Sequence, residues 1–253
     1  GIPVICQKPL AEDYRTAKNM VEACRKAGVP LLVHENWRWQ VPIRALKRRL
    51  EEGIIGKPFR ARITYANSFP VFENQPFLAE LEQFILADMG THILDVARFL
   101  FGEAKSVYCQ TARVHRNIKG EDVASVAMKM DSGLHCNVEL SYASKIEHDR
   151  FPETYILVEG ERGSIELAPD YWLRTTTDSG THSVKIEIPK YEWADEQYRV
   201  VHASIVDTNK DLFKALCNQK QAETTGEDNL KTLQLVFAAY QSARDNRTVE
   251  IEN

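Results

Sequence analysis

Three polar residues are spaced so that they share one face of a predicted helix. Asp88, His92 and Asp95 lie in the segment ADMGTHILDVARFLFGE. At about 100° per residue they fall within roughly 60° of one another. A carboxylate four residues from a histidine can orient the imidazole and favour its charged form, which suits acid/base catalysis. The spacing also fits a solvated helix face with Asp88 near the helix N-terminus, or part of a metal site that would need further ligands.

Two further groups of polar residues follow predicted strands directly. The segment QKPL (7–10) comes after a short apolar run, and HENWRW (34–39) comes after a second one. Open α/β sheets bind ligands beyond the carboxyl ends of their strands, so Lys8 is a candidate ligand-binding group. An ordinary exposed lysine before a loop proline is the alternative. In 34–39, aromatic and polar side chains together suit a sugar-like or ring-shaped ligand, or an interface between two parts of the chain.

The elements that would position these residues begin with an α/β segment. Residues 2–6 and 29–33 are apolar runs of strand length, and residues 11–27 have helical spacing of apolar side chains. Gly28 stands where a helix C-cap glycine is expected. A strand, a helix and a strand within about 35 residues match a βαβ unit. With a helix over 42–52, the α/β segment spans residues 1–56, too little for an independent doubly wound sheet.

The remaining chain, residues 57–253, predicts a mostly antiparallel α+β domain. The segment RARITYANSF alternates as a half-buried strand does. Residues 69–87 read as a loop with a short helix, and residues 88–101 as a helix. Further strands are predicted at 106–114, 123–130, 134–142, 154–160, 164–168, 171–177 and 183–188, and helices at 205–217 and 227–244.

Composition narrows the class of protein. The 253 residues are 43% hydrophobic and 27% charged with a net charge of −4, as in soluble globular proteins. This weak acidity offers no electrostatic footprint for nucleic acid or an anionic membrane, and apolar runs fall short of the ~18 residues of a membrane span. Five scattered cysteines without a CxxC pair favour free, mostly buried thiols in a reducing, cytoplasmic setting. A strand beginning near Gly1, without the features of a signal peptide, suggests that a segment is missing upstream.

Together these segments resemble the glucose–fructose oxidoreductase and inositol dehydrogenase (Gfo/Idh/MocA) family of NAD(P)-dependent oxidoreductases. VICQKPLA is similar to the family's strand followed by Glu-Lys-Pro, with Gln7 in place of the Glu, and NWRWQVP to its Asn-x-Arg segment before a proline. DMGTHILDVARFLFG is similar to its Asp-x-x-x-His helix. VEGERGSIEL and GEDNLKTLQLVFAAYQSA resemble its late hairpin and last helix. The resemblance runs nearly end to end.

The resemblance implies hydride transfer between a nicotinamide and a secondary alcohol of a sugar or polyol. It gives Lys8, Asp88 and His92 catalytic roles: Lys8 near the nicotinamide and the reacting hydroxyl, His92 accepting the hydroxyl proton, and Asp88 orienting His92. Lys8, Pro9, Asn36 and Arg38 would contact NAD or NADP, and Lys8, Trp37, Asp88 and His92 the substrate. The open sheet would join copies of the chain into a dimer or tetramer through its free face.

One family feature is not found in the sequence, because no G-x-G-x-x-G segment follows a strand. The resemblance therefore implies that residues 1–56 are the remnant of a Rossmann-like domain whose first ~120 residues, with the phosphate-binding loop, are absent. We expect residues 1–253 alone to be catalytically silent. Two other hypotheses stay open at this point: a non-enzymatic sugar-binding or dimerisation module, and a metal-dependent hydrolase that uses Asp88, His92 and Asp95.

Overall fold

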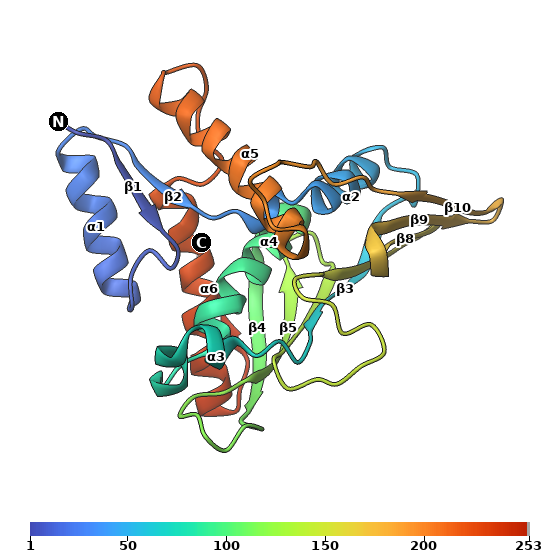
Figure 1. Ribbon diagram of the computed structural model, residues 1–253, viewed down its shortest axis with the longest axis horizontal. Coiled ribbons are helices and arrows are strands. Elements are labelled where there is room, and N and C mark those ends of the chain that lie inside the picture. The colour runs from blue at the N-terminus through green and yellow to red at the C-terminus, as the bar shows by residue number, and fades with distance from the viewer. Residues whose placement is uncertain (252–253) are drawn as a thin grey trace.

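The structure, a computed structural model, describes residues 1–251 and contains two sheets of very different size (Figure 1). The smaller sheet is a parallel pair, β1 (Val4–Gln7) and β2 (Leu31–His34), joined by α1 (Tyr14–Lys26). The Asp13 carboxylate accepts the Thr16 N–H and caps α1, and Gly28 follows the helix with a φ of +65°. The predicted strand, helix and strand are therefore confirmed.

The larger sheet has nine strands in the order β10-β9-β8-β7-β3-β6-β5-β4-β11. β3 and β6 pair in parallel and every other neighbouring pair is antiparallel, so the predicted mostly antiparallel sheet is confirmed. The strands are β3 (Pro58–Ala66), β4 (Ala104–Ala112), β5 (Val123–Met130), β6 (His135–Ser141), β7 (Tyr155–Gly160), β8 (Gly163–Ala168), β9 (Trp172–Thr177), β10 (Gly180–Lys185) and β11 (Val249–Glu250).

The helices that cover this sheet carry the site residues. The longer ones are α2 (Val41–Glu51), α4 (Thr91–Phe101), α5 (Arg199–Leu216) and α6 (Gly226–Asp245). The short α3 (Val71–Asn74) lies between α2 and α4 in the chain, within the 69–87 segment. α5 begins at Arg199 rather than at residue 205 as predicted. One face of β5 is buried at alternate residues, including Val126 and Met128, as expected for a sheet with helices on one side. α6 lies beside β4, and the Ser242 hydroxyl accepts the Cys109 N–H.

The prediction of two buried strands in the α/β segment is correct for β2 and wrong for β1. All four β2 residues are buried or half-buried, because Leu31 and Val33 pack in one apolar cluster with α1 and α6, and Leu32 packs in another with α5. The segment before α6 covers the second edge of the strand. There, the Val33 N–H donates to the Thr224 carbonyl at 2.8 Å. Within residues 1–251, β1 pairs only with β2, and Val4 and Ile5 remain exposed.

The α/β segment, residues 1–56, packs in part against the large sheet. Ile43 and Leu46 of α2 belong to the same apolar core as Ile63 of β3 and Ile156 of β7. The division into residues 1–56 and 57–253, and the assignment of the first part to a Rossmann-like domain, stay predictions.

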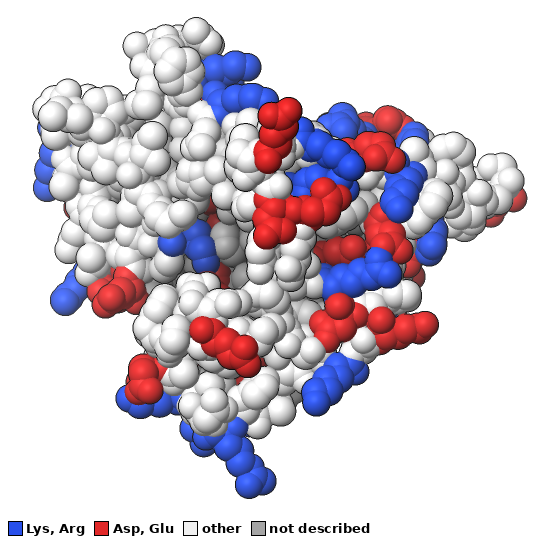
Figure 2. Space-filling view, viewed as in Figure 1, with Lys and Arg blue, Asp and Glu red and all other residues white. Residues whose placement is uncertain are grey.

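Charge and hydropathy follow the expectations from composition. Figure 2 shows basic and acidic side chains interspersed over the right-hand half of the viewed face, without a continuous tract of one sign. No helix within residues 1–251 is long and apolar enough to cross a membrane. The five cysteines are free thiols, as predicted, but only Cys109 and Cys136 are buried, so the prediction that most of them are buried is wrong.

Candidate active site

Lys8 and Asp88 meet between the two parts of the fold. Lys8 directly follows β1, and its Nζ donates to Asp88 Oδ1 at 2.9 Å and to the Asp88 backbone carbonyl at 3.0 Å. Both side chains are about one-fifth exposed, so the ion pair faces solvent on one side. Gln7, which stands where the family has Glu, accepts the Lys8 N–H through its side-chain Oε1 at 2.9 Å. The alternative of an ordinary exposed lysine before a loop proline is wrong, because Lys8 is half-buried and paired with Asp88.

The backbone around Asp88 is a π-helical turn, Leu86–Gly90, that runs into α4. Such turns are rare and occur frequently at functional sites. The Glu121 carboxylate accepts the N–H groups of Phe84 and Leu86 and the hydroxyl of Tyr240, and the Tyr240 oxygen accepts the Ala87 N–H. These bonds satisfy the first N–H groups of the turn and hold Asp88 toward Lys8.

His92 has a different partner from the one predicted. Its Nδ1 lies 2.7 Å from Oε1 of Glu35, and the same oxygen accepts the Trp37 N–H at 2.8 Å. Asp88 instead binds Lys8, so the prediction that Asp88 orients His92 is wrong. The physical reason is the π turn, which changes the angle between Asp88 and His92 from that of a regular α-helix.

Burial dominates the electrostatics of the Glu35–His92 pair. Desolvation raises the pKa of the Glu35 carboxyl to about 7, although the Trp37 N–H and the charge of Lys8 oppose this. Desolvation, together with the nearby positive charge of Lys8, lowers the pKa of His92 well below its ordinary value. An uncharged imidazole at neutral pH can accept a proton, as a general base must.

An open pocket lies beside this pair. The Trp37 ring packs against the His92 imidazole with centroids 4.5 Å apart, and the indole N–H donates to the Thr154 hydroxyl at 3.0 Å. Trp37 also lines a pocket of about 330 Å³, whose lining does not include Lys8, Asp88 or His92. The other lining residues are mostly aromatic or amide-bearing: Phe69, Asn74, Gln75, Phe151, Tyr198, Val201, His202 and Ile205. This lining suits a small ligand with both apolar and hydroxyl-bearing surfaces.

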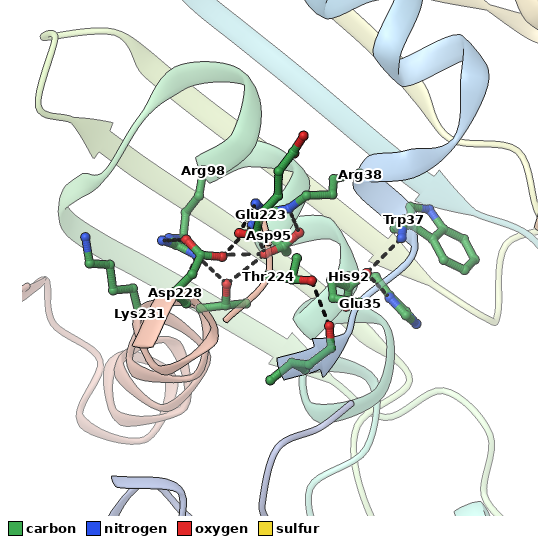
Figure 3. A network of polar contacts seen from close by, with 12 residues as sticks. Glu35, Trp37, Arg38, His92, Asp95, Arg98, Glu223, Thr224, Asp228 and Lys231 are labelled. Carbon is green, nitrogen blue, oxygen red and sulfur yellow. Dashed lines mark hydrogen bonds and ion pairs between the residues drawn. The ribbon is translucent and has the colours of Figure 1, made fainter. Parts of the chain in front are cut away.

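Asn36 and Arg38 flank Trp37 but are engaged with other side chains. The Asn36 amide donates to Ser204 of α5 at 2.8 Å. The Arg38 guanidinium is buried and binds both oxygens of Asp95, through Nε at 2.7 Å, and also Asp228 of α6 at 2.9 Å. Figure 3 shows this cluster on one side, with Arg98 completing it, and Glu35, His92 and Trp37 on the other.

Asp88, His92 and Asp95, which were predicted to share one helix face, therefore each bind a different residue. Asp88 binds Lys8, His92 binds Glu35 and Asp95 binds Arg38. The solvated-face interpretation is wrong, because His92 and Asp95 are buried. The metal hypothesis loses its geometric basis, and residues 1–251 contain no group of three or more metal-ligating side chains that could hold an ion.

The sequence analysis gave no role to Glu35, which the structure places at the centre of the site. Its position directly after a buried strand and two residues before Trp37 was the only feature that pointed to it. Glu121 lies far from the site in the sequence and in no motif, and Asp228 lies in the segment GEDNLKTLQLVFAAYQSA but was given no role.

Comparison with known proteins agrees with this geometry. A profile of the GFO/IDH/MocA C-terminal domain matches residues 43–166. Over its full 253 residues, the chain is 44% identical to the D-apiose dehydrogenase of Paraburkholderia graminis and covers 68% of that protein. The chain belongs to the Gfo/Idh/MocA family. It is an oxidoreductase of this family, and the enzyme expected from the resemblance is confirmed.

Solved structures of the family extend the comparison to three dimensions. An oxidoreductase from Agrobacterium radiobacter, in complex with NAD+, L-tartaric acid and magnesium, has 42% identity and a TM-score of 0.96 over 98% of this chain and 73% of its own. Levoglucosan dehydrogenase, in complex with NADH and levoglucosan, shares the fold with a TM-score of 0.81 at 21% identity, covering 99% of this chain and 74% of its own. The expected absence of the family's first ~120 residues stays a prediction.

Proposed function

We propose that this protein transfers a hydride between NAD and a secondary alcohol of a sugar or polyol. The observation that carries the proposal is that Lys8, which follows β1, binds Asp88 one turn before the buried, uncharged His92. The proteins of similar sequence and fold act on sugars, D-apiose and levoglucosan by their names, and the similar Agrobacterium radiobacter structure holds NAD+. These similarities support the substrate class and the cofactor.

The residues at the carboxyl ends of β1 and β2 fit the nicotinamide end of NAD. Open α/β sheets bind ligands at this edge, and here Lys8 is partly exposed and Pro9 exposed. When bound, NAD supplies the hydride acceptor. Lys8 and Pro9 would contact it there. Asn36 and Arg38, whose side chains are held by Ser204 and Asp95, would support this edge from behind.

The chain's own groups handle the proton and the orientation of the substrate. Lys8 donates a hydrogen bond to the reacting hydroxyl oxygen, and Asp88 holds the ammonium in place for this bond. His92 accepts the hydroxyl proton as the C–H hydrogen leaves with its electron pair. Trp37 forms the wall between His92 and the pocket that receives the rest of the sugar. Acid/base groups in such roles contribute about 10²–10⁴-fold in rate.

The test measures sugar-dependent NADH formation by the protein purified from the organism that produces it. The panel contains D-apiose, levoglucosan and myo-inositol, with NADP+ as the alternative cofactor. We expect Lys8→Met and His92→Gln each to lower turnover at least about 100-fold. Glu159→Gln, in an exposed ion pair with Arg60, serves as the control. If both active-site variants keep full turnover, a non-enzymatic sugar-binding or dimerisation module becomes the better interpretation.

Two related proposals have direct tests. Calorimetric titration of residues 1–253 with NAD(H) and NADP(H) tests whether this chain alone is silent, since binding at micromolar levels would contradict that expectation. We also propose that the free face of the large sheet joins copies of the chain. Sedimentation analysis would show a dimer or tetramer, and a monomer at all concentrations would refute it.

A further inference from the structure

We infer that Glu35 is a positioning residue that keeps the proton of neutral His92 on Nδ1, so that Nε2 presents its lone pair to the substrate hydroxyl. The inference rests on the proposed function for the identity of the proton donor. The geometry of the pair itself does not depend on it.

The hydrogen bonds of Glu35 indicate where the proton lies. Glu35 is fully buried, and its Oε1 accepts the Trp37 backbone N–H at 2.8 Å. An ionised oxygen is the better acceptor for that bond, so the proton in the 2.7 Å contact with His92 belongs to Nδ1. The second oxygen, Oε2, is buried without a hydrogen-bond partner. Oε1 is therefore the oxygen through which Glu35 contacts both Trp37 and His92.

Titratable or charged groups face this pair from each element packed around it. Lys8 comes from the end of β1, His34 from β2, Arg38 from the turn after β2, Asp88 from the π turn and Asp95 from α4. Lys8 and Arg38 favour the ionised carboxylate, whereas burial opposes it. The Glu35 charge then becomes the direct counter-ion of the imidazolium that forms when His92 accepts the substrate proton. The hydride leaves with NAD and the hydroxyl proton stays on Nε2, so charge and atoms balance.

Loss of Glu35 would misplace the imidazole proton. Free neutral imidazole has no carboxylate to hold its Nδ1 proton, and a proton on Nε2 would occupy the position that must accept the substrate proton. Replacing the carboxylate that orients a catalytic histidine in serine proteases lowers kcat by about 10⁴-fold through this tautomer change. We expect about a 10²–10⁴-fold loss here for Glu35→Leu, which removes the acceptor of the Nδ1 proton.

The first experiment reads the tautomer without any turnover. Long-range ¹H–¹⁵N spectra of the protein at pH 8 distinguish a protonated Nδ1 from a protonated Nε2 for each of the seven histidines. His92→Gln identifies the resonance by its loss. We expect the Nδ1–H form in the wild type and its loss in Glu35→Leu, with no change in Glu153→Gln, which removes another buried carboxylate. An Nε2–H form of His92 in the wild type would overturn the inference even if Glu35→Leu does not fold.

The second experiment reads kinetics. Glu35→Leu should lower kcat with little change in the KM for sugar, because Glu35 does not touch the substrate, and Glu35→Asp should recover part of the loss. Full kcat in Glu35→Leu with an unchanged pH profile would overturn the inference. If no sugar is oxidised by the wild type, the proposed function fails, whereas the tautomer measurement still decides the role of Glu35.

Discussion

Lys8 and Asp88, 80 residues apart in the sequence, are joined twice: the Lys8 ammonium binds the Asp88 carboxylate at 2.9 Å and the Asp88 carbonyl at 3.0 Å. The two bonds tie the end of β1 to the π turn before α4. The ammonium therefore has a fixed position next to the helix that carries His92. This arrangement assigns Asp88 to Lys8, whereas the sequence had assigned it to His92.

Asp88→Asn separates the functional value of this ion pair from its structural value. We expect turnover to fall roughly 100-fold, because Lys8 loses the charge that orients it. The free energy of unfolding should change by less than about 1 kcal/mol, since partly exposed ion pairs contribute little to stability. Steady-state kinetics and urea unfolding measure the two quantities. If Asp88→Asn lowers turnover only as much as it lowers the fraction of folded protein, the effect is structural and the functional assignment of Asp88 is contradicted.

Trp37 offers a test of the wall between His92 and the pocket. Trp37→Phe keeps a ring against the imidazole and loses the hydrogen bond to Thr154, which should cost about 1 kcal/mol. Trp37→Ala should cost about 3–5 kcal/mol, because it leaves a cavity in the core, and should raise the KM for sugar. Thermal unfolding and kinetics check both. The exposed Trp193→Ala is the control, with a change within about 0.5 kcal/mol. Similar behaviour of the alanine and phenylalanine variants would show that the indole does not form the wall.

The sequence predicted the elements well and their side-chain partners poorly. Apolar periodicity located α1, β5 and the Gly226–Asp245 helix to within a few residues, because burial of one face imposes that period. It could not reveal that β1 lacks a cover, since exposure depends on which elements lie beside a strand.

The site shows the same division. Lys8 and His92 were found from their position after a strand and on a polar helix face, and the structure brings them close together. The π turn that redirects Asp88 has no sequence signature, because it depends on Glu121 and Tyr240 from distant elements. Glu35 was visible in the sequence, but its bond to His92 joins residues 57 apart and required the fold.

Arg38 was predicted to bind the cofactor, and its contacts give a way to separate that role from a structural one. Arg38→Met leaves the fully buried Asp95 without its bidentate partner and should cost about 3–5 kcal/mol in unfolding free energy. Arg38→Lys should recover only part of this, because an ammonium cannot bind both carboxylate oxygens in the same way. Arg60→Met, which breaks an exposed pair, is the control and should cost less than about 1 kcal/mol. Wild-type stability of Arg38→Lys with a raised KM for NAD would instead support direct cofactor binding.

Glu35 should make the stability of the protein depend on pH in an unusual direction. Burial raises the pKa of its carboxyl from 4.5 to about 7 in the folded state, so between these values the folded protein holds a proton that the unfolded chain has released. The contribution of Glu35 to stability is therefore full at low pH and is lost as pH rises through about 7. At about 1.4 kcal/mol per pKa unit, the loss is on the order of 3 kcal/mol.

Glu35→Gln removes the titrating carboxyl. Comparing this variant with the wild type therefore separates the effect of Glu35 on stability from the opposite effect of His92. The lowered pKa of His92 makes stability fall as pH drops below its unfolded value, but this histidine is present in both proteins. We expect the wild type to lose stability relative to Glu35→Gln between pH 5 and pH 8, measured as unfolding free energies in urea. Parallel stability curves for the two proteins would show that the Glu35 carboxyl titrates normally. A normal pKa would mean that the Glu35 carboxylate is not desolvated in the folded protein. Water would then reach this carboxylate, which its burial in the structure does not indicate.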